Sequence, residues 1–369
     1  MPNYIQVLIN LAIAGVVLYV VIKGLSIGFD KITVKVVNLS NGTKKILFLA
    51  LVGILFVLPF LTNAYFLRTA IIIGIYIVLA LSLNFIVGFT GQLSMGHAAF
   101  YGIGAYTTAL LTVNFGVSFW LALLFSALVA AAFGFLLGIP TLRLRGDYLA
   151  ITTIGFGEIV RLVLVNWTSV TRGPAGIPGI PSPSIFGYTL SSNTANYYLI
   201  LAIVAITIFV FYRILNSRVG SGLQAIREDE VAAEAMGIDT TKLKIMAFTI
   251  GAFFAGLAGS FFASYIHYVS PDSFTYLESV IILCMVVLGG IGSIPGVIVG
   301  AIVLAALPEA LRSIATYRYA IYGMLLIMMM LMRPQGFISL ESLKEGRKKS
   351  GDSNSKKRHQ GFRGATSSK

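Results

Sequence analysis

The sequence alternates long apolar runs with short polar intervals. Several runs reach about 18–20 residues, the length that a helix needs to cross the hydrocarbon core of a bilayer. These runs are apolar on every side, whereas strands of a membrane barrel alternate apolar and polar side chains. The pattern predicts an all-α polytopic membrane protein. The expected spans lie at 5–22, 46–61, 69–88, 94–113, 119–138, 147–166, 197–214, 243–264, 278–288, 295–311 and 317–332.

Glycine or proline interrupts several of these runs, notably near 88–96 and 289–295. Some runs are also short for a full crossing. Transporters often place such interrupted helices near the midplane of the membrane. We therefore expect about 10–11 transmembrane helices, some of them broken or re-entrant.

Composition supports the membrane assignment. Hydrophobic residues make up 57% of the chain and charged residues 11%, whereas about 25% is charged in an ordinary soluble domain. The segment Met1 to Gln6 has no basic region of the kind that opens a signal peptide, so we expect the first run to be retained. The single cysteine, Cys284, lies in an apolar run, and no metal-ligand spacing is present.

The net charge of +13 follows from an uneven distribution of the 27 Lys and Arg residues. Most of them fall in alternate polar intervals and in the C-terminal tail, which is the distribution that the positive-inside rule describes. The rule predicts a cytoplasmic C-terminus and an N-terminus outside. It also accounts for the basic charge without nucleic acid as a partner.

Catalytic motifs are absent from the sequence. There is no phosphate-binding loop, no His-Glu-x-x-His and no nucleophile elbow. Glu158 and Arg161 stand out inside an apolar run, three residues apart and therefore on one helix face. The two side chains either pair with each other so that burial is tolerated, or take part in a substrate path.

The polar interval at 216–244 contains a candidate docking helix. Leu223, Ile226, Ala233 and Met236 approximate one apolar face, and Gly237 stands where a helix C-cap belongs. A short helix with small side chains and acidic neighbours suits a groove on another protein. A plain surface helix is the alternative.

Four segments carry a family resemblance. Residues 225–238 read Ala-Ile-Arg-Glu-Asp-Glu-Val-Ala-Ala-Glu-Ala-Met-Gly-Ile, and they are joined by the glycine-rich blocks at 88–106, 142–159 and 288–296. Together they resemble the permeases of branched-chain amino acid ABC importers, the LivH/LivM family, in its LivM branch. The loop 171–181 is similar too, and the resemblance covers about 69–338. Val231 departs from the broader coupling-helix pattern of ABC importers, which has Glu at that position.

The resemblance implies a transporter subunit and not an enzyme, with no cofactor in this chain. Its expected partners are a second, LivH-like permease subunit, two subunits that bind ATP and Mg, an extracytoplasmic substrate-binding protein, and membrane lipid. The expected location is the inner or cytoplasmic membrane. The expected organisation is N-terminal spans with a basic loop at 1–68, a permease core at 69–338 with a coupling helix at about 223–237, and a basic disordered tail at 339–369.

The same resemblance implies three sets of site residues. Coupling to the ATPases is expected from Arg227, Glu228, Asp229, Ala232, Ala233, Glu234, Met236 and Gly237. The candidate translocation path contains Gln92, Ser94, His97, Glu158, Arg161, Gly289, Gly290 and Gly292. The candidate contact with the binding protein is made by Arg172, Gly173, Pro174 and Gly176.

Each set has a structural alternative. His97 can be a structural histidine, the glycines of 289–296 can serve tight packing, and the outer loop at 167–196 can be a lid on its own subunit. Alternatives also remain for function. A urea or short-chain amide importer shares the motifs, and a solitary channel or ion-coupled carrier would need no ATPase dock.

Overall fold

The computed structural model describes residues 41–310 except 143, 145, 186 and 187, together with the single residues 323 and 327. The expected span at 5–22 and the tail at 339–369 fall outside the described residues. So does the span at 317–332, apart from the two single residues.

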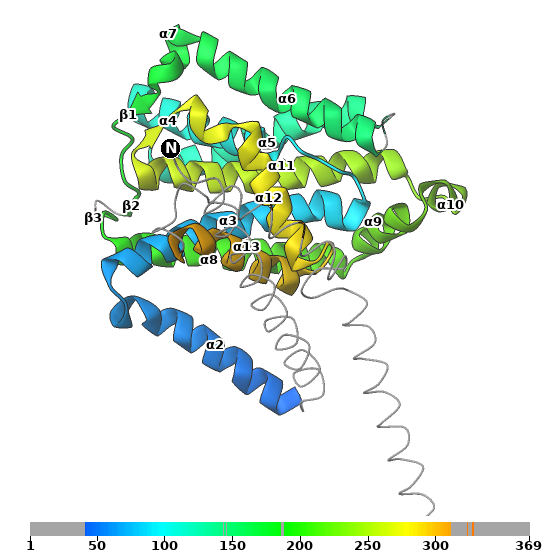
Figure 1. Cartoon of the computed structure of the whole chain (residues 1–369), viewed down its shortest axis with the longest axis horizontal. Helices are drawn as coiled ribbons and strands as arrows, with labels where there is room; N and C mark the ends of the chain where they lie inside the picture. Colours follow the sequence, from blue (N-terminus) through cyan, green and yellow to red (C-terminus); the bar gives the residue numbers. More distant parts are fainter. Residues whose placement is uncertain are drawn as a thin grey trace, which may run out of the picture.

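Helices make up most of this part of the chain (Figure 1). They are α2 (Asn41–Leu61), α3 (Ala64–Thr90), α4 (His97–Phe115), α5 (Phe119–Thr141), α6 (Asp147–Asn166), α7 (Thr168–Thr171), α8 (Asn193–Leu215), α9 (Arg218–Glu228), α10 (Glu230–Ala235), α11 (Thr240–Ile266), α12 (Tyr276–Gly289) and α13 (Ile294–Ala310), with the 3₁₀ turns η1 (Gly173–Ala175) and η2 (Pro271–Phe274). Four two-residue strands form two antiparallel pairs, β1 (Ile177–Pro178) with β4 (Tyr268–Val269) and β2 (Ser184–Ile185) with β3 (Tyr188–Thr189).

The predicted fold class is confirmed. Nine of the expected spans lie in the described part of the chain, and each coincides with a helix. By length and composition, α3, α5, α6, α8 and α11 can each cross a membrane. At 14 and 17 residues, α12 and α13 are shorter. They pack against each other and against α3.

Helices α3 and α11 form the centre of the bundle. Within their most apolar windows 78% of α3 and 61% of α11 is buried, whereas only 22% of α6 is. Small residues let the central helices approach closely, which is how helices associate where lipid removes the hydrophobic drive. A Cβ on Gly104 of α4 would lie 2.4 Å from the carbonyl oxygen of Gly256 of α11.

Both expected interruptions are present. Helix α3 ends at Gly91, which has φ +72°, and residues 91–96 are not helical before α4 begins. Between α12 and α13 the chain turns through Gly290 and Gly292, which have φ +114° and +84°. Glycine is required at these positions because other residues rarely adopt positive φ.

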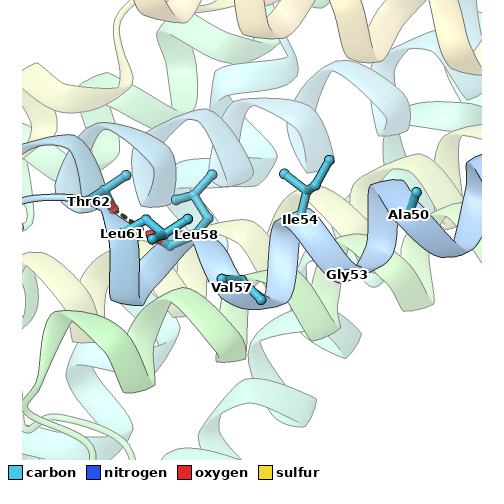
Figure 2. A pocket seen from close by; sticks show the side chains of 7 residues that line it. All are labelled: Ala50, Gly53, Ile54, Val57, Leu58, Leu61 and Thr62. Atoms are coloured by element: carbon cyan, nitrogen blue, oxygen red, sulfur yellow. Dashed lines mark hydrogen bonds between the residues drawn. The ribbon is translucent and has the colours of Figure 1, made fainter.

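Helix α2 stands apart from the main bundle (Figure 1). The hydroxyls of Tyr197 and Tyr198 on α8 hold it by donating to the carbonyls of Leu55 and Phe56, at 3.0 and 2.8 Å. An open groove of about 560 Å³ runs along α2 (Figure 2). Its one polar side chain, Thr62, donates to the Leu58 carbonyl of the same helix. None of the predicted site residues lines this groove.

Candidate functional site

The non-helical segment at 91–96, here called the 91–96 break, returns into the bundle. His97, the first residue of α4, has its Nε2 atom 2.7 Å from the hydroxyl of Ser82. Ser82 lies eight residues before the end of α3, which is about 12 Å along a helix. Helix α4 therefore begins inside the bundle and not level with the end of α3. Irregular backbone at membrane depth is tolerated only where protein buries it or where it lines a cavity.

The side chains of the 91–96 break that were predicted for the path are buried. Gln92 Oε1 accepts a hydrogen bond from the Thr90 hydroxyl at 3.0 Å. Gln92 Nε2, the Ser94 hydroxyl and His97 Nδ1 have no hydrogen-bond partner among the residues that the structure describes. Burial of an unsatisfied polar atom costs about 1–3 kcal/mol. The break and the first residue of α4 thus hold three polar atoms that are open to a bond from outside the described residues.

Neighbouring helices hold the backbone of the 91–96 break. The amide of Met95 donates to the Thr153 hydroxyl of α6, and the amide of Ala98 donates to the Ser279 hydroxyl of α12, both at 2.9 Å. A Cβ on Gly96 would lie 2.1 Å from the carbonyl oxygen of Thr153. Helix α6 therefore packs directly on the break, so a displacement of α6 would also displace the break.

The glycines of 289–296 take part in close packing. A Cβ on Gly289 would lie 2.4 Å from the carbonyl oxygen of Gly296, and Gly290 and Gly292 are also buried. The amide of Gly292 donates to Oδ1 of Asn84 on α3 at 2.8 Å. Tight packing, one of the two interpretations of this block, is what the structure shows. A role in the path stays a prediction.

The last turns of α3 connect these parts to the candidate coupling element, by which we mean α9 and α10. The guanidinium of Arg227 on α9 donates to the carbonyl of Gly88 at 2.6 Å. A Cβ on Gly88 would lie 2.1 Å from Asn84 Oδ1 and 2.6 Å from the Gly292 amide nitrogen. Only glycine fits there, and α9 and the α12–α13 turn, which are distant in sequence, meet at the end of α3.

The single helix expected at 223–237 is corrected to two helices. Asp229 is extended, with φ −157° and ψ 112°, and separates α9 from α10. Its carboxylate accepts from the amides of Val231 and Ala232 at 2.9 and 3.1 Å, which is an N-cap. The expected C-cap at Gly237 is present. Gly237 has φ +82°, its amide donates to Glu234, and the Ile238 amide donates to Ala233, the pattern of a Schellman motif.

The apolar face expected for that helix is also corrected. Leu223, Ile226 and Ala233 are buried against the chain, but Met236 is 84% exposed. Val231 is 62% exposed on α10 as well. The exposed part of the candidate coupling element is therefore α10, with Ala232, Glu234 and Gly237 also exposed, whereas Ala233 is not available to a partner.

Charged side chains anchor the same region. Lys244 of α11 pairs with Glu230 of α10, and the lysine side chain is only 4% exposed. Asp239 caps α11 by accepting from the Lys242 amide at 3.0 Å. That backbone bond, with the Lys242 side chain, lowers the pKa of Asp239. Glu228 is exposed and so are its neighbours Arg227 and Asp229.

Glu158 and Arg161 form the expected pair on α6. Arg161 donates from Nε and Nη2 to the same oxygen of Glu158, at 2.9 and 2.6 Å. The pair is not buried by its own chain, since 41% of the Glu158 side chain and 27% of the Arg161 side chain is exposed. A charged residue at the centre of a membrane helix costs about 2.5–3.5 kcal/mol on insertion scales. Lipid is therefore a poor neighbour for this pair.

The outer loop packs onto its own subunit. Strand β1 pairs with β4, and a Cβ on Gly176 would lie 2.2 Å from the carbonyl oxygen of Val269. Gly173 is buried, whereas Arg172 and Pro174 are exposed. Arg172 has φ +61°, an uncommon conformation for a residue with a side chain. The structure shows this packing, whereas a role as a lid and a contact with a binding protein both stay predictions.

These features define a class of protein: a multi-pass helical membrane permease with breaks at membrane depth and a short exposed helix, α10. The family model described as branched-chain amino acid transport system / permease component matches residues 65–332. The chain belongs to this family.

Named relatives agree with that membership. The chain is 42% identical over 324 residues to the high-affinity branched-chain amino acid transport system permease protein LivM of Salmonella typhimurium, covering 82% of this chain and 76% of that protein. It is 41% identical over 342 residues to LivM of Escherichia coli, covering 86% and 80%. LivH of Salmonella typhimurium is 27% identical over 290 residues, covering 71% and 91%. No solved structure matched the chain.

Three residues that hold the site together were not predicted from the sequence. Ser82, Asn84 and Thr153 bond respectively to His97, the Gly292 amide and the Met95 amide. The available signal was their polarity within apolar runs, because polar side chains inside membrane helices usually bond to a neighbouring segment.

Proposed function

We propose that this chain is a permease subunit of an ATP-driven importer of branched-chain amino acids. Family membership supports the substrate class. The observation that carries the coupled mechanism is the direct bond from Arg227 to the Gly88 carbonyl, next to an exposed helix. That bond joins a surface suited to a partner to the end of the helix that precedes the 91–96 break.

In this proposal α10 docks into a groove on a cytoplasmic ATPase subunit, which binds ATP and Mg. Val231 and Met236 supply exposed apolar contact. Glu228 and Glu234 offer carboxylates to basic residues of the partner. Because Arg227 ties α9 to α3, a displacement of α10 is passed to the break and to the Gly292 turn that bonds Asn84.

The path is proposed to run beside the 91–96 break. An amino acid in transit carries an ammonium and a carboxylate, and Gln92, Ser94 and His97 each have a polar atom without a partner in the described part of the chain. A passage of this kind binds weakly, so selection falls to an external binding protein.

The remaining partners follow from the same assignment. A LivH-like permease subunit completes the path, and the exposed Arg172 and Pro174 face the binding protein outside. The C-terminus is then cytoplasmic and the N-terminus outside, in the cytoplasmic or inner membrane.

Uptake of labelled leucine tests the proposal. Cells that lack the gene are compared with cells in which it is re-expressed, with excess isoleucine, valine, urea or acetamide as competitors. Restoration that only isoleucine and valine suppress is the expected result. Urea or acetamide uptake that follows the gene while leucine uptake does not would move the substrate to the short-chain amide class.

Purification tests the mechanism separately. An importer subunit should bring ATP-binding subunits with it when it is extracted in mild detergent. A solitary channel or ion-coupled carrier should purify alone and transport without ATP, and that outcome would overturn the coupled mechanism.

A further inference from the structure

The outer surface of α6 differs from the exposed surfaces of α5 and α8 because a partly exposed charge pair, Glu158 and Arg161, lies on it. Residues spaced three or four apart point away from the bundle and form what we call the α6 stripe. It comprises Tyr148, Ile151, Gly155, Ile159, Leu162 and Asn166, all exposed. The helix lies at one edge of the bundle (Figure 1).

The Glu158–Arg161 pair flanks the α6 stripe at membrane depth. Glu158 is eleven residues into the helix, about 16 Å from its start, which is near the middle of a hydrocarbon core about 30 Å thick. At that depth neither side chain easily reaches the headgroups. Charged residues inside membranes almost always face a protein interior or a water-filled cavity.

Helices α5 and α8 provide the comparison within the same chain. The exposed surface of α5 consists of apolar side chains such as Leu124, Leu128 and Leu136. The exposed surface of α8 at membrane depth is likewise apolar, with Ile206 and Phe209. Those two surfaces suit lipid tails. The exposed surface of α6 also carries Ile151, Ile159 and Leu162, but it adds the Glu158–Arg161 pair, and it is at least as exposed.

Gly155, in the centre of the α6 stripe, is a second and independent observation. A Cβ at this position would meet nothing within 4 Å, so no packing within residues that the structure describes requires glycine there. Glycine in a helix interior is unfavourable relative to alanine. In membranes, small residues on a helix surface let the backbone of another helix approach closely.

We propose that the α6 stripe is the surface on which the LivH-like second permease subunit packs, with the Glu158–Arg161 pair facing the space between the two subunits. The inference rests on the proposed function, which supplies the partner. Gly155 admits a helix of that subunit, and the pair is then surrounded by protein and water and not by lipid. Because α6 also holds the 91–96 break through Thr153, the contact between subunits lies directly behind the candidate path.

The test replaces glycine by a bulky residue at the surface. Gly155→Leu adds a side chain where an added Cβ has no described atom within 4 Å, and it raises the helix propensity of α6. The subunit should therefore fold and insert normally. Ala132→Leu, on the exposed apolar surface of α5, is the matched control. The complex is expressed whole, extracted in mild detergent, and assayed for co-purifying permease and ATPase subunits and for leucine uptake.

We expect Gly155→Leu to reduce the co-purifying second permease and leucine uptake at least tenfold, while Ala132→Leu leaves both unchanged. Normal assembly and uptake in both variants would overturn the inference, and so would loss in the α5 variant alone. In either case the unaltered complex still contains its partners, so the proposed function stands. If the unaltered chain purifies without a second permease and without ATPases, the proposed function itself fails.

Crosslinking checks the result without depending on assembly defects. A photoreactive phenylalanine derivative is placed at Ile159 on the α6 stripe or at Leu128 on α5, and the adducts are identified by mass spectrometry in native membranes. Capture of the second permease from position 159 and of lipid from position 128 supports the inference. The reverse pattern overturns it.

Discussion

Helices α9 and α10 are consecutive and were expected to be one helix, yet they differ in how much of each is held by the rest of the protein. Helix α9 is held by its own chain through Leu223, Ile226 and the bond from Arg227 to Gly88. Helix α10 leaves Val231 and Met236 exposed. The difference separates two tasks that a coupling element must perform. In the proposed mechanism, α9 transmits force into the bundle and α10 remains available to a partner.

We expect the largest effect on transport from a substitution that removes the bond between α9 and α3. Arg227→Ala removes a charged hydrogen-bond donor from the Gly88 carbonyl, and such bonds contribute about 1.5–3 kcal/mol. We expect leucine uptake to fall at least about tenfold, while the ATPases still co-purify because α10 is unchanged. Uptake, ATP hydrolysis and co-purification are measured on the same complex.

Arg218→Ala is the matched control, since Arg218 is an exposed arginine on the same helix. It should transport normally. If Arg227→Ala also transports normally, the bond to Gly88 plays no part in coupling. The proposed separation of force transmission by α9 from docking by α10 would then be wrong.

We expect the next largest effect on coupling from a substitution at Gly237, at the C-terminal end of α10. Gly237→Pro cannot adopt the φ of +82° found there and removes the amide that donates to Glu234. We expect normal insertion, loss of the α10 end and a several-fold lower ATPase stimulation by substrate. Gly237→Asn, which tolerates positive φ, should retain most of the stimulation. Equal activity of the proline variant would show that the end of α10 is not used.

A smaller effect is expected from altering the exposed side chains. Met236→Lys and Glu234→Lys should leave the fold intact, because exposed substitutions usually change stability by no more than about 0.5 kcal/mol. They should weaken co-purification of the ATPases and lower coupling. Met236→Leu keeps the apolar contact and serves as the control. A lysine variant that binds ATPases as well as the unaltered protein would remove Met236 or Glu234 from the docking surface.

We expect the smallest effect on coupling from removing a helix N-cap, and this effect should differ between the caps of α10 and α11. Asp229→Ala removes the cap of α10, at a cost of about 1 kcal/mol, and should lower coupling modestly. Asp239→Ala removes the cap of α11 and should leave coupling unchanged.

The pKa of Asp239 is lowered by its bonds to Lys242. The contribution of Asp239 to the stability of the folded state is therefore present above the unfolded-state pKa and is lost as pH falls through the lowered value. Thermal unfolding in detergent between pH 6 and pH 3, with and without Asp239→Ala, measures that loss.

Local pattern was sufficient for the helices but not for the connections between them. Nine spans could be read from hydrophobicity because each apolar run ends at polar residues or glycine. The division at Asp229 was missed because the apolar residues keep helical spacing across it. The signal was present nonetheless, since Asp followed by a short run of helix-forming residues is an N-cap pattern.

The candidate site shows the same limit. Gln92, Ser94 and His97 could be grouped because they are close in sequence, and the structure buries all three together. The bond between Arg227 and Gly88 joins residues 139 positions apart. No local pattern contains such a pairing, because it depends on how α9 is placed against α3. The exposure of the Glu158–Arg161 pair also depends on tertiary packing, and pair spacing alone does not determine it.

The bond between Asn84 and the amide of Gly292 has a consequence for biogenesis, because 208 positions separate the two residues. During synthesis α3 leaves the ribosome long before the α12–α13 turn exists. Until that turn has been synthesised, Asn84 Oδ1 has no Gly292 amide from which to accept a hydrogen bond. The carboxamide must then be shielded from lipid by the insertion machinery or by water. The centre of the permease is therefore completed late, and a chain truncated before residue 292 would present an unfinished polar surface to cellular quality control.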